Sequence, residues 1–293
     1  MKLSLVIPAK SKDDPKLAEL LASIERQDFP KDEMEVLVIT EGTSESAKAI
    51  GIRRAKGEVI GILASDNELV ASDDLSKLYK GAEVYGASYP GRYTYVRNDD
   101  VLNRYFSLIG GNDPLSFYMG KNDRLPYYRN GQVVSNATFG DNGYFVRRYL
   151  IEKTDLDNYY HIDNANEIPS GLTMQLLERS IWHKTGGNIF SFFRKRYRYG
   201  LQHAFNPNRR WHLVDFRKPQ DIWRLLCFIL FTITLIQPLT ISFRGYLKIR
   251  DVAWFIHPIA CIFTLATYTT LLIHLGLRKL IQSSSAHMTA RTA

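Results

Sequence analysis

Short apolar segments alternate with helical patterns over the first 85 residues of the chain. Three segments are apolar and rich in β-branched side chains, and each predicts a buried strand: residues 3–7, 36–39 and 59–63. The stretches that separate and follow them have apolar positions at helical spacing and typical helix starts, and they predict helices over residues 14–27, 43–55 and 73–85. Strands and helices that alternate in this way predict an α/β fold with a doubly wound sheet.

The pattern is less regular from residue 86 to residue 182, where tyrosine and phenylalanine accumulate. We expect a long insertion there, with a β segment near residues 132–139 and a helix over residues 171–182. The first strand is followed by Pro8-Ala-Lys-Ser-Lys12 and not by a glycine-rich turn. This argues against an ordinary dinucleotide site.

Two apolar runs without Asp, Glu, Lys or Arg lie near the C-terminus, at residues 225–243 and at residues 252–277, and the second contains His257 and His274. Each is long enough to cross a hydrocarbon core of about 30 Å as a helix, and we expect two transmembrane helices. Two alternatives remain open. The runs could form a helix pair buried in a soluble domain, and the break at Gln237-Pro238 allows the first run to be re-entrant.

The basic charge is concentrated just before these runs. Of the lysines and arginines that give the chain its net charge of +8, nine lie between residues 189 and 224. Over residues 190–205 one helical stripe is formed by Phe190, Phe193, Tyr197 and Leu201, and basic residues occupy much of the rest, which is typical of an amphipathic helix in a membrane interface. The alternative is a solvated helix that packs its aromatic side chains on the domain. We do not expect nucleic-acid binding, because the adjacent apolar runs would hold this stretch at a bilayer.

These observations give a domain plan. We expect a cytoplasmic catalytic domain over residues 1–185, a basic interfacial helix and linker over 186–221, a two-helix transmembrane region over 222–278 and a disordered tail over 279–293. We expect no signal peptide at the N-terminus, and the two cysteines exclude a disulfide framework. The expected location is a cell membrane, as a multi-pass protein.

The segment 57–68 carries the strongest chemical signal. Its apolar strand ends abruptly in Ser65, Asp66, Asn67 and Glu68. In an open α/β sheet, ligands bind beyond the carboxyl ends of the strands. Acidic side chains at that place suit Mg²⁺ or Mn²⁺, and such an ion could hold a diphosphate. The alternative is a polar strand-to-loop turn in which Asp66 is a cap.

Several motifs in the same order resemble the family-2 glycosyltransferases of the GT-A fold, in a membrane-anchored form. The first strand ends in Ile-Pro8, and Ala64-Ser-Asp66 lies where the family has its Asp-x-Asp motif. Residues 140–148, Gly-Asp-Asn-Gly-Tyr-Phe-Val-Arg-Arg, resemble the acceptor-side block, and Asp163 falls where the family has an acidic pair. The resemblance covers residues 1–182 and implies a mixed, Rossmann-like sheet.

Three departures from the family pattern matter. Ala64 replaces the first Asp of Asp-x-Asp, and we expect Glu68 to supply the missing metal ligand beside Asp66. Thr40-Glu41 replaces the usual Asp-Asp, so the sequence does not indicate which base the donor nucleotide carries. Only Arg210-Trp211 remains of the motif of processive polysaccharide synthases, and we do not expect a processive polymerase.

The resemblance implies an inverting transfer from a UDP- or GDP-sugar to a membrane lipid-linked acceptor, with Mg²⁺ or Mn²⁺ as cofactor. Asp163 is then the catalytic base, although it could instead be a loop carboxylate that caps a helix. Residues placed at the nucleotide sugar are Pro8, Lys10, Glu41, Arg54, Ser65 and Asp66. Residues placed at the acceptor or the diphosphate are Asp141, Asn142, His183, Arg194 and Arg198. His183 could equally be a packed surface histidine.

An acceptor hydroxyl needs a base, whereas a phosphate oxygen is already ionised. An intact Asp163 therefore favours the hydroxyl of a lipid-linked glycan over a polyprenyl or dolichyl phosphate. A polyprenyl-phosphate sugar synthase is the first alternative. A membrane scaffold that binds nucleotide sugars through a degenerate site is the second, because Ala64 weakens the metal motif.

Overall fold

The computed structural model describes residues 1–111, 113–120, 128–129, 132–133, 142–167, 174–184, 187–204 and 213–289. The chain divides into two compact units. The first unit comprises residues 1–186 and 209–215, and the second comprises residues 187–208 and 216–293.

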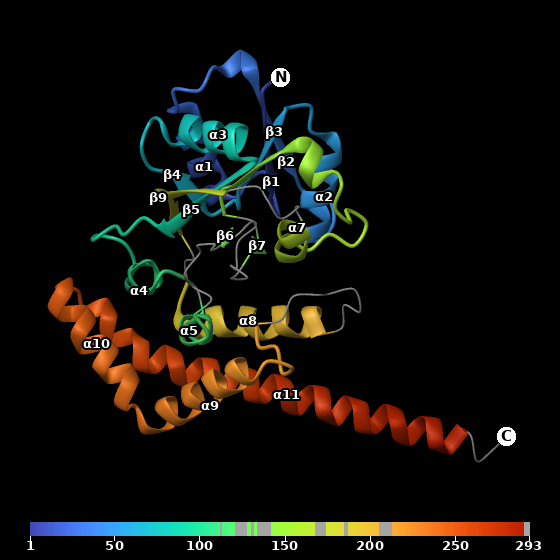
Figure 1. Cartoon of the computed structure of the whole chain (residues 1–293), viewed down its shortest axis with the longest axis vertical. Helices are drawn as coiled ribbons and strands as arrows, with labels where there is room; N and C mark the ends of the chain where they lie inside the picture. Colours follow the sequence, from blue (N-terminus) through green and yellow to red (C-terminus); the bar gives the residue numbers. More distant parts are fainter. Residues whose placement is uncertain are drawn as a thin grey trace. The chain divides into compact units, whose positions relative to one another are not determined.

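A mixed sheet of seven strands forms the centre of the first unit, in the order β2-β1-β3-β8-β5-β9-β4 (Figure 1). The strands are β1 (Leu3–Pro8), β2 (Met34–Ile39), β3 (Val59–Ile62), β4 (Asn67–Leu69), β5 (Ala87–Tyr93), β8 (Tyr144–Arg147) and β9 (Met174–His183). A separate pair, β6 (Tyr128–Arg129) and β7 (Gln132–Val133), lies within the predicted β segment and its N-terminal flank. Strands β2, β1 and β3 are parallel, as predicted, whereas β8 runs antiparallel to β3.

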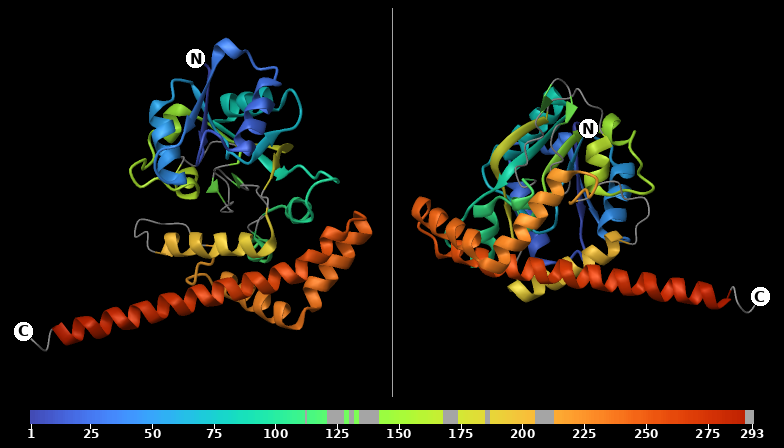
Figure 2. Two further views of the ribbon diagram at one scale, coloured as in Figure 1. Left: turned by 180° about the vertical axis from the view of Figure 1, so that it is seen from behind. Right: turned by 60° about the horizontal axis from the view of Figure 1, so that its bottom comes forward.

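Helices cover both faces of this sheet, which confirms the doubly wound prediction (Figure 2). The longer ones are α1 (Pro15–Glu25), α2 (Ser44–Arg54), α3 (Asp74–Tyr85), α4 (Val101–Ile109) and α7 (His161–Glu167); α5 (Pro114–Tyr118) and α6 (Arg148–Ile151) are short. Successive side chains of β1 point to opposite faces. Leu5 belongs to the core that includes α1 and α3, while Val6 belongs to the core that includes α2 and α7.

The predicted helix starts are confirmed at their caps. Asp14 accepts a hydrogen bond from the backbone N–H of Lys16, with Pro15 at the first helical position. Thr43 and Ser46 form a reciprocal capping box at the start of α2. These local interactions can be identified in the sequence because each needs only neighbouring residues.

The predicted helix over residues 171–182 is wrong, because residues 174–183 form β9. This strand pairs with β5 on one side and with β4 on the other. Pairing along both edges satisfies the backbone of β9 and overrides its local helical pattern. The described part of the insertion also contains α4 and α5, which the sequence did not predict.

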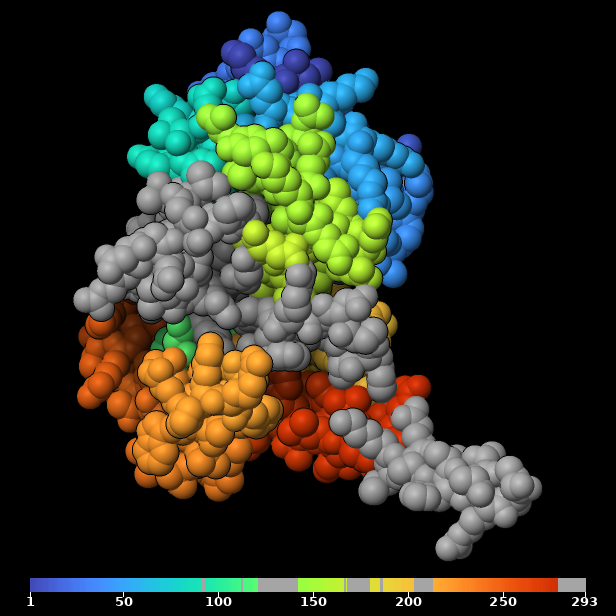
Figure 3. Space-filling model, turned by 45° about the vertical axis from the view of Figure 1, so that its right-hand side comes forward, coloured from blue at the N-terminus to red at the C-terminus, as the bar shows by residue number. Residues whose placement is uncertain are grey.

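The second unit is helical, with α8 (Ile189–Ala204), α9 (Pro219–Thr234), α10 (Ile236–Lys248) and α11 (Ile256–Thr289). The predicted amphipathic helix over 190–205 is α8. Helix α9, coloured light orange, is exposed on the face of the molecule shown in Figure 3. The expected disordered tail is largely helical, because α11 continues to Thr289.

The expectation of two transmembrane helices needs correction. Within the described residues, one helical stretch, Val252–Arg278, is long and apolar enough to cross a bilayer, with a mean hydropathy of 1.7. The other apolar run is split into α9 and α10, which meet at an angle of 82°. The break lies at Leu235, whose φ of +57° is left-handed and which is followed closely by Pro238. This geometry matches a broken span or the re-entrant alternative.

Candidate active site

The candidate site lies at the carboxyl edge of the parallel strands. Strand β1 is flanked by β2, which follows it in the chain, and by β3 on the other side, so the order of connection reverses between β1 and β3. In open α/β sheets this switch point forms the ligand crevice. Pro8 ends β1, and Ser65 and Asp66 follow β3 at the same edge. The structure therefore places three of the predicted nucleotide-sugar residues at one end of the sheet.

A tight turn over residues 64–67 presents Asp66. The backbone N–H of Asn67 donates to the carbonyl of Ala64 (3.0 Å), and the side-chain oxygen of Asn67 accepts from the N–H of Ala64 (2.9 Å). Asn67 is buried, and its amide donates to Oδ1 of Asn142 at 3.2 Å. Asn142 donates in turn to the Tyr93 hydroxyl at 2.7 Å. The turn after β3 is thus bonded to the start of the predicted acceptor-side block.

His183 lies next to Asp66. Its Nε2 is 3.3 Å from Oδ1 of Asp66, and its ring packs on the ring of Tyr93 with the centroids 4.6 Å apart. The antiparallel pairing of β4 with β9 sets this distance, because Asn67 is opposite His183 in the register. The backbone N–H of Lys184 also donates to the carbonyl of Asp66 at 2.8 Å. Asp66, Asn142 and His183, all predicted from the sequence, therefore meet in one cluster.

Glu68 is held by two cations. Its carboxylate lies 2.6 Å from Nζ of Lys184 and 3.1 Å from Arg26. Lys184 also contacts Glu19 at 2.6 Å and lies over the ring of Trp182. Because successive residues of β4 point to opposite faces, Glu68 is directed away from Asn67. In this structure Glu68 is thus paired with Lys184 and Arg26, and its role as a metal ligand beside Asp66 stays a prediction.

The donor set around Asp66 suits a metal that is shared with a substrate. Within the described residues, no group of three or more His, Cys, Asp or Glu side chains is gathered so as to hold a metal ion by itself. Mg²⁺ is commonly held by one or two carboxylates together with substrate phosphates, without a complete protein cage. Asp66, one-fifth exposed at the strand end, fits this mode of binding.

The other predicted nucleotide contacts lie after β1 and β2. Glu41 and Arg54 form a bidentate ion pair, with N–O distances of 3.1 and 3.0 Å, and both side chains are about half exposed. Lys10 is exposed two residues beyond the end of β1. The Glu41–Arg54 pair joins the carboxyl end of β2 to the last turn of α2. The structure brings these two residues together, as a pair that could meet a base or ribose.

Asp163 is buried in α7, with 4% of its surface exposed. The start of α7 is bound to α2 through Glu45, which accepts from the backbone N–H of His161 (3.1 Å) and contacts Nδ1 of His161 (2.9 Å). Nζ of Lys48, itself 1% exposed, lies 3.1 Å from Glu45. Burial by itself would raise the pKa of Glu45, but the charges and hydrogen bonds of Lys48 and His161 hold that pKa well below its ordinary value.

Three further predicted residues are not among the described residues of the first unit. Asp141 is outside the described residues. Arg194 and Arg198 are exposed on α8 in the second unit. Three groups that contact the Asp66 cluster were not predicted from the sequence: the Tyr93 side chain, Lys184 and the side-chain amide of Asn67. Asn67 and Lys184 each adjoin a predicted residue, whereas no sequence signal distinguished Tyr93 from the other aromatic residues of the insertion.

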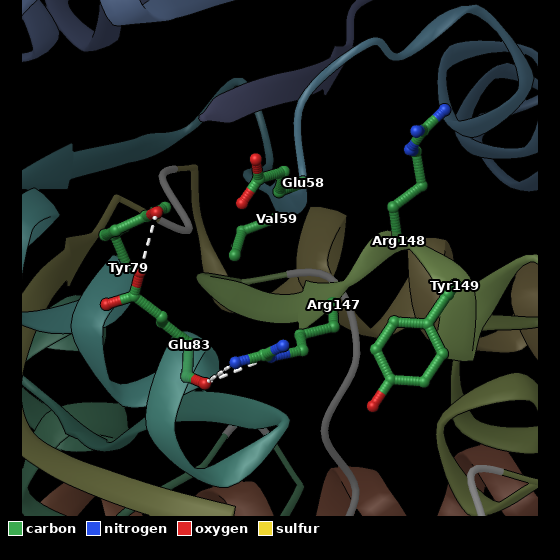
Figure 4. Close-up of a pocket in the computed structure, with 7 residues that line it drawn as sticks. All are labelled: Glu58, Val59, Tyr79, Glu83, Arg147, Arg148 and Tyr149. Atoms are coloured by element: carbon green, nitrogen blue, oxygen red, sulfur yellow. Dashed lines mark hydrogen bonds between the residues drawn. The ribbon is translucent and has the colours of Figure 1, made fainter. Parts of the chain in front are cut away.

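A shallow pocket lies at the other end of the sheet (Figure 4). Glu58 and Val59 line it at the start of β3, far along the strand from Asp66. Arg147 points toward the Glu83 carbonyl and donates to it, whereas Arg148 points away from it. Because these polar groups are directed at each other and the pocket is at the amino edge of β3, it is not part of the candidate site.

Comparisons with known proteins agree with this architecture. No protein-family profile and no curated protein sequence matches the chain. The solved structure of the mannosyltransferase PcManGT from Pyrobaculum calidifontis, in complex with GDP-Man and Mn²⁺, is similar over 92% of this chain and 87% of that one, with a TM-score of 0.50 and 14% identity. S. aureus TarS 1-349 is similar over 92% and 90%, with 15% identity, but its TM-score of 0.43 is too low to support an argument. The chain therefore has the mixed α/β fold of a glycosyltransferase.

Proposed function

We propose that the chain is a glycosyltransferase that moves a sugar from a nucleotide-diphosphate sugar to a lipid-linked acceptor. The observation that carries this proposal is the position of Asp66, beside the strand switch point and 3.3 Å from His183. The fold shared with a mannosyltransferase that was solved with GDP-Man and Mn²⁺ supports a donor of this class. The same likeness supports Mg²⁺ or Mn²⁺ as the cofactor, with Asp66 as the protein carboxylate that holds it.

The chemistry that this site must supply is stabilisation of a leaving diphosphate. A bound divalent cation supplies Lewis-acid stabilisation of that charge. Asp66 is fixed for this role by its turn, by the N–H of Lys184 and by the ring of His183. The imidazole of His183 adds a hydrogen-bonding group at the same place. Such fixed groups act without reorganisation during the reaction.

Asp163 is the proposed base for the acceptor hydroxyl. A single displacement by that hydroxyl inverts the anomeric carbon, and the proton passes to the Asp163 carboxylate. Attachment of α7 to α2 through Glu45 holds this carboxylate in a defined position. The residues proposed to contact the nucleotide sugar are Pro8, Lys10, Glu41, Arg54 and Ser65. Asn142 is proposed to contact the acceptor. The residues proposed to act at the acceptor or the diphosphate are Asp141, Arg194 and Arg198.

The second unit supports a membrane location for the acceptor. Its helices expose large apolar side chains, including Trp223 and Ile233, which are 67% and 69% exposed. We propose that the first unit lies on the cytoplasmic side of a cell membrane and that the acceptor is lipid-borne. A polyprenyl-phosphate sugar synthase is the second candidate, because the same membrane location suits a lipid phosphate.

The proposal is tested by nucleotide release from a panel of UDP- and GDP-sugars, with Mn²⁺ and a lipid extract, followed by mass measurement of the glycolipid product. We expect one donor to react and the Asp66→Asn variant to lose at least ~100-fold of that rate. Asp32→Asn, an exposed carboxylate before β2, is the matched control and should keep the rate. If the unsubstituted chain and the Asp32→Asn variant bind a nucleotide sugar but release no free nucleotide, the scaffold alternative is supported and the proposal is overturned.

A further inference from the structure

Helix α8 lies along the middle of α11 within the second unit. The rings of Phe193 and Phe263 are stacked with their centroids 5.5 Å apart. The Tyr197 hydroxyl and Nδ1 of His274 are 2.9 Å apart. Gly200 lies so close to α11 that a Cβ at this position would be 2.6 Å from Leu271. The contacts on α11 therefore extend from residue 263 to residue 274.

The basic side chains of α8 are on its other sides. The residues that contact α11 form one helical stripe, and the intervening positions carry four cations: Arg194, Lys195, Arg196 and Arg198. Three of them are exposed and Arg196 is partly exposed. In consequence, the positive charge of α8 lies on sides of the helix that do not contact α11.

This packing limits how deeply α11 can enter a bilayer. Residues 263–274 lie in the central and C-terminal part of the apolar stretch Val252–Arg278. If that stretch crossed a bilayer, α8 and its four cations would lie beside it within the hydrocarbon core. Charged side chains at that depth are strongly disfavoured unless they face a protein interior or a water-filled cavity.

Most of the exposed apolar side chains follow one stripe on each of the remaining helices. Along α9 they are Trp223, Leu226, Leu230 and Ile233; along α10 they are Ile236, Leu239, Phe243 and Leu247; along α11 they are Ile259, Ile262, Ile273 and Leu277, and Leu272 is exposed outside this stripe. Away from the stripes, Phe228, Ser242 and Cys261 are buried in the unit. A helix that exposes one apolar face is suited to lie in the plane of an interface.

We propose that the second unit is a single-leaflet module that binds the anionic surface of a bilayer without crossing it. The proposal rests on the membrane location in the proposed function but not on the reaction. The apolar stripes of α9, α10 and α11 enter the acyl region, and Lys195 and Arg196 of α8 meet acidic headgroups. Arg244, Lys248 and Arg250 then stay on the cytoplasmic side, whereas two crossings would place them outside, against the positive-inside rule.

Cysteine labelling in sealed vesicles tests this arrangement with the full chain. Lys12→Cys, Lys248→Cys and Ala293→Cys are each made in a background that carries Cys227→Ser and Cys261→Ala, and a membrane-impermeant maleimide is added to either face. We expect all three positions to be labelled from the same face. If Lys248→Cys is labelled from the face opposite to Lys12→Cys, the chain crosses the bilayer twice. If only Ala293→Cys is labelled from that opposite face, the chain crosses once. Either result overturns the proposal. The unsubstituted background should remain unlabelled.

Liposome flotation tests the headgroup contact independently. The purified chain is mixed with vesicles of neutral lipid, with or without a fraction of phosphatidylserine. We expect stronger binding to the anionic vesicles, reduced ~tenfold or more by the double variant Lys195→Glu/Arg196→Glu and reduced by high salt. Nucleotide release in detergent should be unchanged, which separates this result from failure of the enzyme. Binding that ignores lipid charge, or a soluble oligomer that needs no lipid, would overturn the proposal.

Discussion

Nε2 of His183 lies 3.3 Å from Oδ1 of Asp66, although one residue ends β9 and the other precedes β4. The two strands are paired antiparallel, so the contact is built into the sheet. A histidine at this distance can fix the orientation of the carboxylate that we propose as the metal ligand. This contact predicts the effect of replacing His183.

Replacing His183 by Gln should raise the Mn²⁺ concentration needed for nucleotide release and lower the rate by ~10–100-fold, which is usual for groups that orient a metal ligand. The measurement is a Mn²⁺ titration of nucleotide release. Asp32→Asn, the exposed carboxylate before β2, is the control and should leave the Mn²⁺ dependence unchanged. A Mn²⁺ dependence that is unchanged in His183→Gln would exclude this role.

Replacing Asp163 by Asn should lower the rate of transfer to a sugar hydroxyl by ~10²–10⁴-fold, because a general base is lost. The neighbouring Asn164 bonds the N–H of Tyr160 and the side chain of Thr154, so Asn164→Asp should affect stability more than rate. Product formation and the thermal unfolding midpoint are measured for both variants. A fully active Asp163→Asn enzyme would favour a phosphate acceptor.

The Glu45 carboxylate should stabilise the first unit at neutral pH and lose this effect in acid. Its pKa is lowered in the folded protein, so its contribution is present above the ordinary value of 4.5 and declines as the pH falls below that value. Glu45→Gln removes the charge partner of buried Lys48, which we expect to cost about 3–5 kcal/mol. Thermal midpoints measured from pH 7 to pH 3 should converge for the two proteins; a constant difference would contradict the assignment.

Gly57 should not tolerate a side chain. A Cβ at this position would lie 2.5 Å from the backbone N of Ser4 and 2.6 Å from the carbonyl carbon of Leu3. Since backbone atoms cannot move away as a side chain can, we expect Gly57→Ala to cost about 1–3 kcal/mol. Gly276→Ala on α11 is the control, because a Cβ there meets nothing within 4 Å. Equal thermal midpoints for the two variants would show that the close approach is relieved at no cost.

The sequence predicted those features that depend on neighbouring residues. The first three strands, the helices between them and the caps at Asp14 and Thr43 follow from local patterns, and so does the place of Asp66 at a strand end. One error concerns a pairing between distant residues. Strand β9 was expected to be a helix because its neighbours β5 and β4 cannot be identified from its own residues. The contact of Glu68 with Lys184 could not be predicted for the same reason, because Lys184 directly follows β9.

The position of β9 between β5 and β4 has a consequence for synthesis of the chain. Strand β4 joins the sheet only through β9, so residues 67–69 have no strand partner in this sheet until residues 181–183 have left the ribosome. The turn that presents Asp66 is therefore completed late, just before the helices of the second unit emerge. Because translation adds roughly 5–20 residues per second, the nascent domain spends several seconds with this edge open. A chain truncated before β9 should accordingly expose β4 to chaperones and proteases.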